Sequence, residues 1–118
     1  MTNRANVLWA IVIAAGALSW SAATAYADDA KIKRGMEVYA EQKCSVCHSI
    51  GDKGNKKGPL DEVGSKLSEA EIREWIVNPK VMTEKTKATR KPPMKAYPNL
   101  PAADLDALVE YLDSLKKK

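Results

Sequence analysis

The sequence is poor in residues that bind metals or form crosslinks. It contains one histidine and two cysteines, and all three lie in the stretch CSVCH, residues 44–48. Because a closed structural zinc site needs about four ligands, this cluster is a poor start for one. The single histidine excludes a two-histidine metal site within the chain. A disulfide between Cys44 and Cys47 would close a very small loop, so it would add little stability and would leave His48 unexplained.

The alternation of apolar and polar residues that marks half-buried strands is also lacking. Helical spacing of apolar residues instead predicts helices over 28–43, 68–78 and 101–115. Ser68, followed three residues later by Glu71, predicts a capping box at the start of the second helix. The glycine-rich stretch 49–67 and the proline-containing stretch 80–100 are predicted to be irregular. The fold class is therefore all-α. This argues against a thioredoxin-like redox pair, because that motif expects a βαβ setting.

Residues 1–27 have the composition of an export signal. Arg4 precedes an uncharged stretch that begins at Val7, and the small residues Ala25 and Ala27 suit a signal peptidase. We therefore predict a signal peptide over 1–27 and one domain over 28–118, exported to the periplasm. The alternative is a retained membrane anchor, because the uncharged stretch is just long enough to span a bilayer. Export makes nucleic-acid partners unexpected, despite a formal net charge of +4.

The spacing Cys-x-x-Cys-His has a chemical explanation in covalent haem attachment. Two thiols one helical turn apart can add to the two vinyl groups on one edge of a porphyrin. His48 then lies beneath the iron, where its imidazole becomes an axial ligand. The sequence thus predicts one haem c, attached through Cys44 and Cys47. A bound haem would also supply the apolar core that so small a domain otherwise has difficulty building.

Methionine is the usual partner of histidine in a haem electron carrier, and it raises the reduction potential. Beyond the predicted signal the chain has Met36, Met82 and Met94. Met36 falls on the expected inner face of the first helix and is interpreted as a core residue. Met94 follows Pro92 and Pro93, which restrict the backbone and would present its sulfur rigidly. We therefore favour Met94 over Met82 as the second ligand.

Several stretches, taken in chain order, resemble the pattern of class I c-type cytochromes, the small monohaem kind. They are the first helix with its glycine and tyrosine, CSVCH, KKGPL, REWIVNPK, KPPMKAYPNL and LDALVEYL. The resemblance implies three main helices around one haem, with the first and last helices crossing at Gly35. It also implies that the carbonyl of Pro59 accepts a hydrogen bond from His48. By the same likeness Trp75 packs beside the haem, with its N–H toward a propionate or simply within the core.

Iron that is held by two protein ligands has no open position for a substrate, so such a centre exchanges one electron and makes no bonds. The expected function is electron transfer, not enzyme catalysis. Basic residues near the two loops predict redox partners that are acidic where they dock, unless these residues only solvate the surface. They are Lys53, Lys56, Lys57, Lys80, Lys85, Lys87, Arg90, Lys91 and Lys95. The alternatives are a haem subunit of a periplasmic oxidoreductase complex, for example a sulfur-oxidising one, and a gas-binding or peroxidase-like haem protein.

Overall fold

The computed structural model describes residues 20–118, most of which are helical. The elements in chain order are α1 (Trp20–Glu41), the 3₁₀ turn η1 (Cys44–Val46), β1 (Ser49–Ile50), β2 (Lys53–Gly54), α2 (Val63–Lys66), α3 (Glu69–Val77), α4 (Pro79–Thr86) and α5 (Ala102–Asp113). The strands β1 and β2 pair antiparallel over two residues each. The all-α prediction is confirmed, although the stretch expected to be a loop after CSVCH contains this small hairpin and α2.

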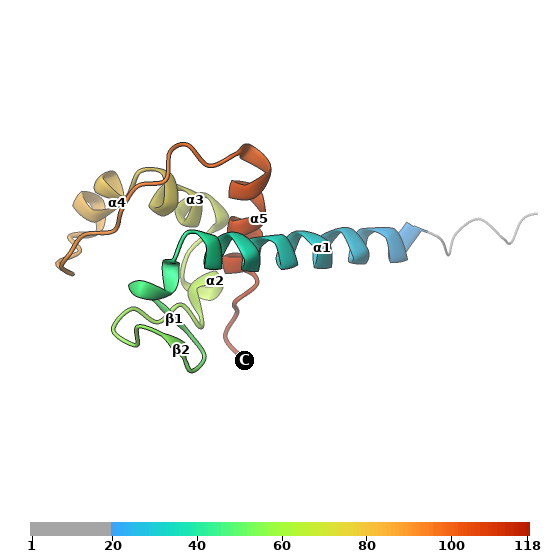
Figure 1. Cartoon of the computed structure of the whole chain (residues 1–118), viewed down its shortest axis with the longest axis horizontal. Coiled ribbons are helices and arrows are strands. Elements are labelled where there is room, and N and C mark those ends of the chain that lie inside the picture. The colour runs from blue at the N-terminus through green and yellow to red at the C-terminus, as the bar shows by residue number, and fades with distance from the viewer. Residues whose placement is uncertain (1–19) are drawn as a thin grey trace, which may run out of the picture.

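The helices α1 and α5 cross at the centre of the domain (Figure 1). Gly35 of α1 lies directly against the backbone of α5. A β-carbon at this position would collide with the carbonyl oxygen of Ala107 and would stand 2.5 Å from Cβ of Tyr111. Beside this contact the rings of Tyr39 and Tyr111 meet edge to face, with centroids 6.0 Å apart. The absence of a side chain at Gly35 therefore allows the close crossing that the sequence predicts.

A bidentate ion pair joins the first turn of α5 to α1. The Nε and Nη2 atoms of Arg34 each donate to a carboxylate oxygen of Asp104, both at 3.0 Å. These hydrogen bonds hold the pKa of Asp104 below its usual value. Pro101 precedes the helix and makes no side-chain cap. Asp104 instead places a negative charge near the amino end of α5, where the helix dipole favours it.

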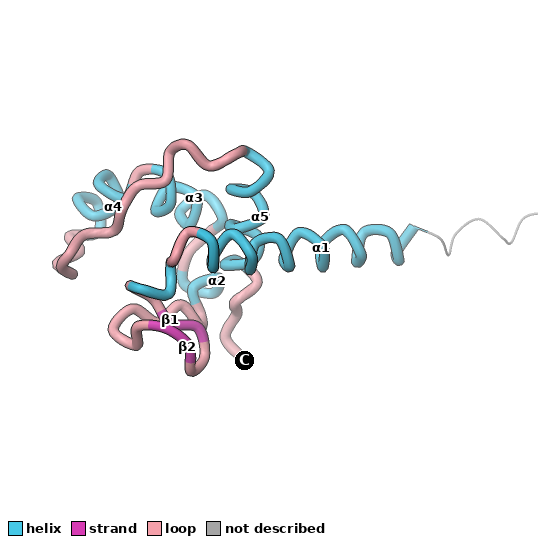
Figure 2. The backbone as a smooth tube through the Cα atoms, viewed as in Figure 1, coloured by secondary structure: helices cyan, strands magenta, loops and turns pink. Residues whose placement is uncertain are grey.

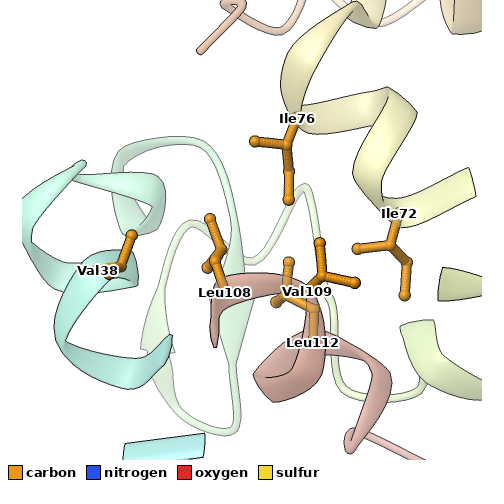
Figure 3. Close-up of a cluster of buried hydrophobic side chains, with 6 residues drawn as sticks. All are labelled: Val38, Ile72, Ile76, Leu108, Val109 and Leu112. Atoms are coloured by element: carbon orange, nitrogen blue, oxygen red, sulfur yellow. The ribbon is translucent and has the colours of Figure 1, made fainter. Parts of the chain in front are cut away.

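The core lies between α1, α3 and α5 and consists of aliphatic side chains (Figure 3). Its buried members are Val38, Ile72, Ile76, Leu108, Val109 and Leu112. Within α3 and α5 they are one, three or four positions apart, so each helix presents one apolar face to its neighbours. The partly buried side chains that pack against this cluster extend it toward the cavity described below.

The amino end of α3 carries the capping arrangement that its sequence indicates. Ser68 Oγ accepts a hydrogen bond from the Glu71 amide at 3.2 Å, and Glu71 Oε2 accepts one from the Ser68 amide at 2.9 Å. Leu67, just before the cap, packs against the cluster that contains Ile72. The capping box thus satisfies two amide donors and sets the position at which α3 begins.

Two features of the helices differ from the sequence prediction. The helix α4 was expected to be irregular, but Pro79 stands in its first turn, where a missing N–H is tolerated. At its other end the hydroxyl of Thr86 donates to the carbonyl of Met82 at 2.7 Å.

Met36 is 52% exposed and Val38 is fully buried. The interpretation of Met36 as a core residue was therefore wrong, because α1 is rotated so that Val38 faces inward.

The first turns of α1 extend away from the rest of the domain (Figure 2). All side chains from 25 to 31 are exposed there. Within the described residues, α1 runs from Trp20 to Glu41 and includes the predicted cleavage position after Ala27. Residues 1–19 of the predicted signal segment 1–27 lie outside the described residues. The signal peptide and the membrane anchor therefore both stay predictions. Within 20–118, no helix has both the length and the apolar character needed to cross a membrane.

Candidate functional site

An apolar cavity of about 350 Å³ is lined by the end of α1, η1, α3, α5 and the segment that follows α4. This volume falls in the range of small-molecule and cofactor sites. Much of the wall is aliphatic, with Leu60, Leu67 and Leu112 among its members. The residues with functional chemistry on the wall are Cys44, Cys47, His48, Trp75, Arg90 and Met94. The cavity thus brings together every predicted site residue except Pro59.

The CSVCH stretch turns sharply at the carboxyl end of α1. Lys43 has a left-handed conformation, with φ of 55°, and it redirects the chain into η1. The amides of Cys47 and His48 both bond to the carbonyl of Cys44, at 3.2 and 3.0 Å. The turn places both cysteines on the cavity wall, and no disulfide joins them. Before haem is attached, burial raises the pKa of the Cys44 thiol to about 11, so the unattached thiol keeps its proton at neutral pH.

The imidazole of His48 is oriented by a backbone carbonyl. Its Nδ1 lies 3.1 Å from the carbonyl oxygen of Gly58, and because a carbonyl only accepts, Nδ1 carries the proton. The Nε2 lone pair is then available to a metal. Burial lowers the pKa of His48. The hydrogen bond to Gly58 partly offsets this decrease, and the positive charge of Arg90 lowers the pKa further. The imidazole is therefore neutral at neutral pH, the form that binds metals.

The carbonyl that orients His48 belongs to Gly58 and not to Pro59, so that prediction was wrong by one residue. The cause is a parallel bridge between Ser49 and Pro59. Ser49 donates its amide to the Gly58 carbonyl at 3.1 Å, and its own carbonyl accepts from the Leu60 amide at 2.8 Å. In this register the Gly58 carbonyl faces the CSVCH stretch, and Pro59 only positions it.

The structure separates the three methionines that the sequence offers. Met94 is half-buried and lies on the cavity wall with His48. Met82 is 3% exposed within α4, and Met36 is exposed on α1. Among the described residues that line the cavity, Met94 is the one methionine. Ligation by Met94 stays a prediction, and the placement of its side chain is consistent with it.

Trp75 and Pro59 were predicted from the family resemblance. Trp75 is half-buried in α3 and lies on the cavity wall, where its ring can pack on a planar group. Its predicted bond to a propionate stays a prediction. Pro59 is exposed and does not belong to the wall as the structure describes it.

Sequence reasoning missed Tyr39 and Arg90 as site residues. The hydroxyl of Tyr39 is buried without a hydrogen-bond partner among the described residues, and burial raises the pKa of Tyr39 to about 12. Arg90 Nη2 donates to the carbonyl oxygen of Cys47 at 2.5 Å. The position of Tyr39 on the inner face of α1 indicated burial, but nothing local indicated the contact of Arg90, because its partner is distant in sequence.

The donor set of the cavity fits a covalently bound haem. Two cysteine sulfurs without a disulfide, an imidazole whose Nδ1 is hydrogen-bonded to a carbonyl, and a thioether line one apolar cavity. These are the groups that attach and ligate haem c. The unpartnered hydroxyl of Tyr39 also shows that this wall is not complete by itself. The fold and the site together define a small haem protein of the c type.

Comparison with known families agrees with this class. The chain belongs to the cytochrome c family, whose model, described as "Cytochrome c", matches residues 32–116. The protein therefore carries haem c covalently bound through Cys44 and Cys47, and it has a haem-based role in electron transfer to redox partners.

One curated relative is an oxidase subunit. Cytochrome c oxidase subunit 2 of Alkalihalophilus pseudofirmus is 28% identical over 92 residues, which cover 70% of this chain and 25% of the relative. The chain thus spans about a quarter of the length of that relative. No solved structure matches the chain significantly.

Proposed function

We propose that this chain is an exported, periplasmic electron carrier whose haem has His48 and Met94 as axial ligands. The observation that supports this is the shared cavity, which Met94 and His48 both line although they come from separate segments. Two protein ligands leave no open position for a substrate. When bound, the haem supplies reversible one-electron chemistry. The side chains of the cavity bind it, orient it and exclude water from it.

The role that we propose for each residue of the site follows from its contacts and its position on the cavity wall. The Gly58 carbonyl holds the proton at Nδ1 of His48 and so keeps Nε2 free for the metal. The thioether of Met94 raises the reduction potential, because it stabilises the reduced state better than a second imidazole would. The aliphatic wall lowers the local dielectric constant, and Trp75 on this wall would pack against the ring of a bound haem.

Mass and absorption spectra of the exported protein test this proposal together. We expect a mass equal to residues 28–118 plus one haem, because the signal is cleaved and both thiols are attached. We also expect the oxidised protein to show the weak absorption band at the red end of the spectrum that a sulfur-to-iron bond produces. A colourless product would exclude the haem protein, and a haem protein without that band would exclude Met94 as ligand.

The basic residues near the cavity support partners that are acidic at their docking site. Arg90 contacts the Cys47 carbonyl and lies beside Gly58, so the basic stretches 53–57 and 85–95 lie near each other at the cavity. The lysines of both stretches are exposed. A concentrated positive field speeds the approach of anions and is screened by salt.

Electron transfer to an anionic reagent is therefore expected to depend on salt. The oxidation rate by the hexacyanoferrate anion should fall about tenfold between ~0.01 and ~1 M salt, because the Debye length shortens from about 30 to about 3 Å. Stopped-flow kinetics measure this rate. A cationic oxidant of similar driving force is the control, and its rate should rise with salt. Equal salt dependence for both reagents would show that the basic residues do not steer docking.

A second candidate function is a haem subunit of an oxidoreductase complex. The observation that favours it is the likeness to an oxidase subunit. The chain matches only about a quarter of that relative, so the activity of the whole relative does not transfer to it directly. Purification of the tagged protein from its native membranes and periplasm distinguishes the two. A carrier should elute alone, and a subunit should elute with a catalytic chain in fixed ratio.

A further inference from the structure

The segment that carries Met94 has few attachments to the rest of the domain. Before it, the Ala88 amide bonds to the Thr83 carbonyl at 3.1 Å, and after it the Tyr97 amide bonds to the Ile76 carbonyl at 2.8 Å. Apart from the half-buried Met94, the side chains of residues 89–96 are exposed. A loop with so few internal bonds has several positions available to it unless something else restrains it.

Arg90 supplies such a restraint. Its Nη2 donates to the carbonyl of Cys47, and within the described chain this is the one hydrogen bond that residues 89–96 make. Its guanidinium also lies against Gly58, where a β-carbon would collide with Nη1 and would stand 2.9 Å from Cζ. The absence of a side chain at Gly58 therefore leaves the space that Arg90 occupies. Arg90 thus connects the loop of Met94 to the stretch that holds Cys47 and His48.

We propose that Arg90 is a positioning residue that holds the thioether of Met94 at the cavity opposite His48. This inference rests on the proposed ligation by Met94. Only Lys91, Pro92 and Pro93 separate Arg90 from Met94, and the fixed φ angles of two prolines make this connection stiff. Fixing one end of a stiff connection restricts the other end. The bond from Arg90 to Cys47 therefore limits how far the sulfur of Met94 can move away.

The restraint predicts how readily an external ligand displaces Met94. We compare the oxidised holoprotein with its Arg90→Ala variant during titration with imidazole, and follow the loss of the sulfur-to-iron band. A charge-assisted hydrogen bond that favours the closed loop opposes imidazole binding. We expect Arg90→Ala to bind imidazole about tenfold more tightly than the unchanged protein. Arg90→Lys keeps one charged donor and should recover part of the difference.

Lys91→Ala is the matched control. Lys91 is an exposed cation next to Arg90, and it makes no hydrogen bond or ion pair among the described residues. Lys91→Ala removes one positive charge from the loop, as Arg90→Ala does, but it leaves the bond from Arg90 to Cys47 intact. We expect its imidazole affinity to stay within about twofold of the unchanged protein. Thermal unfolding followed by circular dichroism shows whether either variant alters the helices, which a positioning role does not require.

The outcomes separate this inference from the proposed function. If the unchanged protein lacks the sulfur-to-iron band, ligation by Met94 is wrong and the role of Arg90 is wrong with it. If the band is present but neither Arg90→Ala nor Lys91→Ala binds imidazole more tightly than the unchanged protein, the ligation stands and Arg90 does not position Met94. A similar increase in both variants would assign the effect to charge alone, which also overturns the positioning role.

Discussion

Replacement of Met94 with alanine is expected to remove the sulfur-to-iron band and to lower the reduction potential by on the order of 0.1 V. Axial ligands set haem potentials over a span of about 0.8 V, and methionine lies toward its upper part. The same change opens a position on the metal, so the reduced variant should bind carbon monoxide at neutral pH. Optical redox titration and carbon monoxide difference spectra measure the two effects.

Met82→Leu is the control for this prediction. Met82 was the other candidate ligand in the sequence, and it is buried in α4 at 3% exposure. Leucine has nearly the same volume, so the substitution should cost less than about 1.5 kcal/mol of stability and should leave the spectrum unchanged. Loss of the band in Met82→Leu, with Met94→Ala unaffected, would assign the ligand to Met82 and would contradict the proposed site.

Replacement of Gly35 with valine is expected to have the largest effect on stability. Its β-carbon would enter the space of the Ala107 carbonyl and lie 2.5 Å from Cβ of Tyr111. Both obstacles belong to the backbone or its first side-chain atom, so neither can rotate away. The helices α1 and α5 would have to separate, which we expect to cost about 3 kcal/mol or more of the unfolding free energy.

Ala40→Val is the matched control, because it creates the same residue on the exposed side of α1. There the substitution should cost only about 0.5 kcal/mol through the lower helix propensity of valine. Denaturant unfolding of the two holoproteins compares the costs. Similar costs would mean that the crossing at Gly35 has room for a side chain, contrary to the contacts described above.

The parts of the site that could be predicted depend on residues close together in sequence. The two cysteines and the histidine lie within one turn, so their spacing alone indicates haem attachment. The capping box at Ser68 and Glu71 is similarly local, and the structure confirms it. Gly35 was predictable because a glycine on an apolar helix face has few explanations other than close packing.

The errors concern contacts between distant segments. The partner of His48 was assigned to Pro59 and is Gly58, because the register of the bridge at Ser49 decides which carbonyl faces the ring. The helix α4 was missed because its sequence has a weak apolar pattern, and the burial of Met82 depends on the packing around it. A local pattern contains no information about either.

By itself, the sequence determined the helical class of this protein, the chemistry of cofactor attachment and the short set of possible axial ligands. These follow from bond lengths and helical periods, which act over a few residues. Only the tertiary structure decided which carbonyl orients the histidine and which methionine lines the cavity. It also decided which cation connects the loop of Met94 to the stretch that holds Cys47. Those choices depend on how separate segments pack, and a shift of one residue in register or a small rotation of one helix changes them.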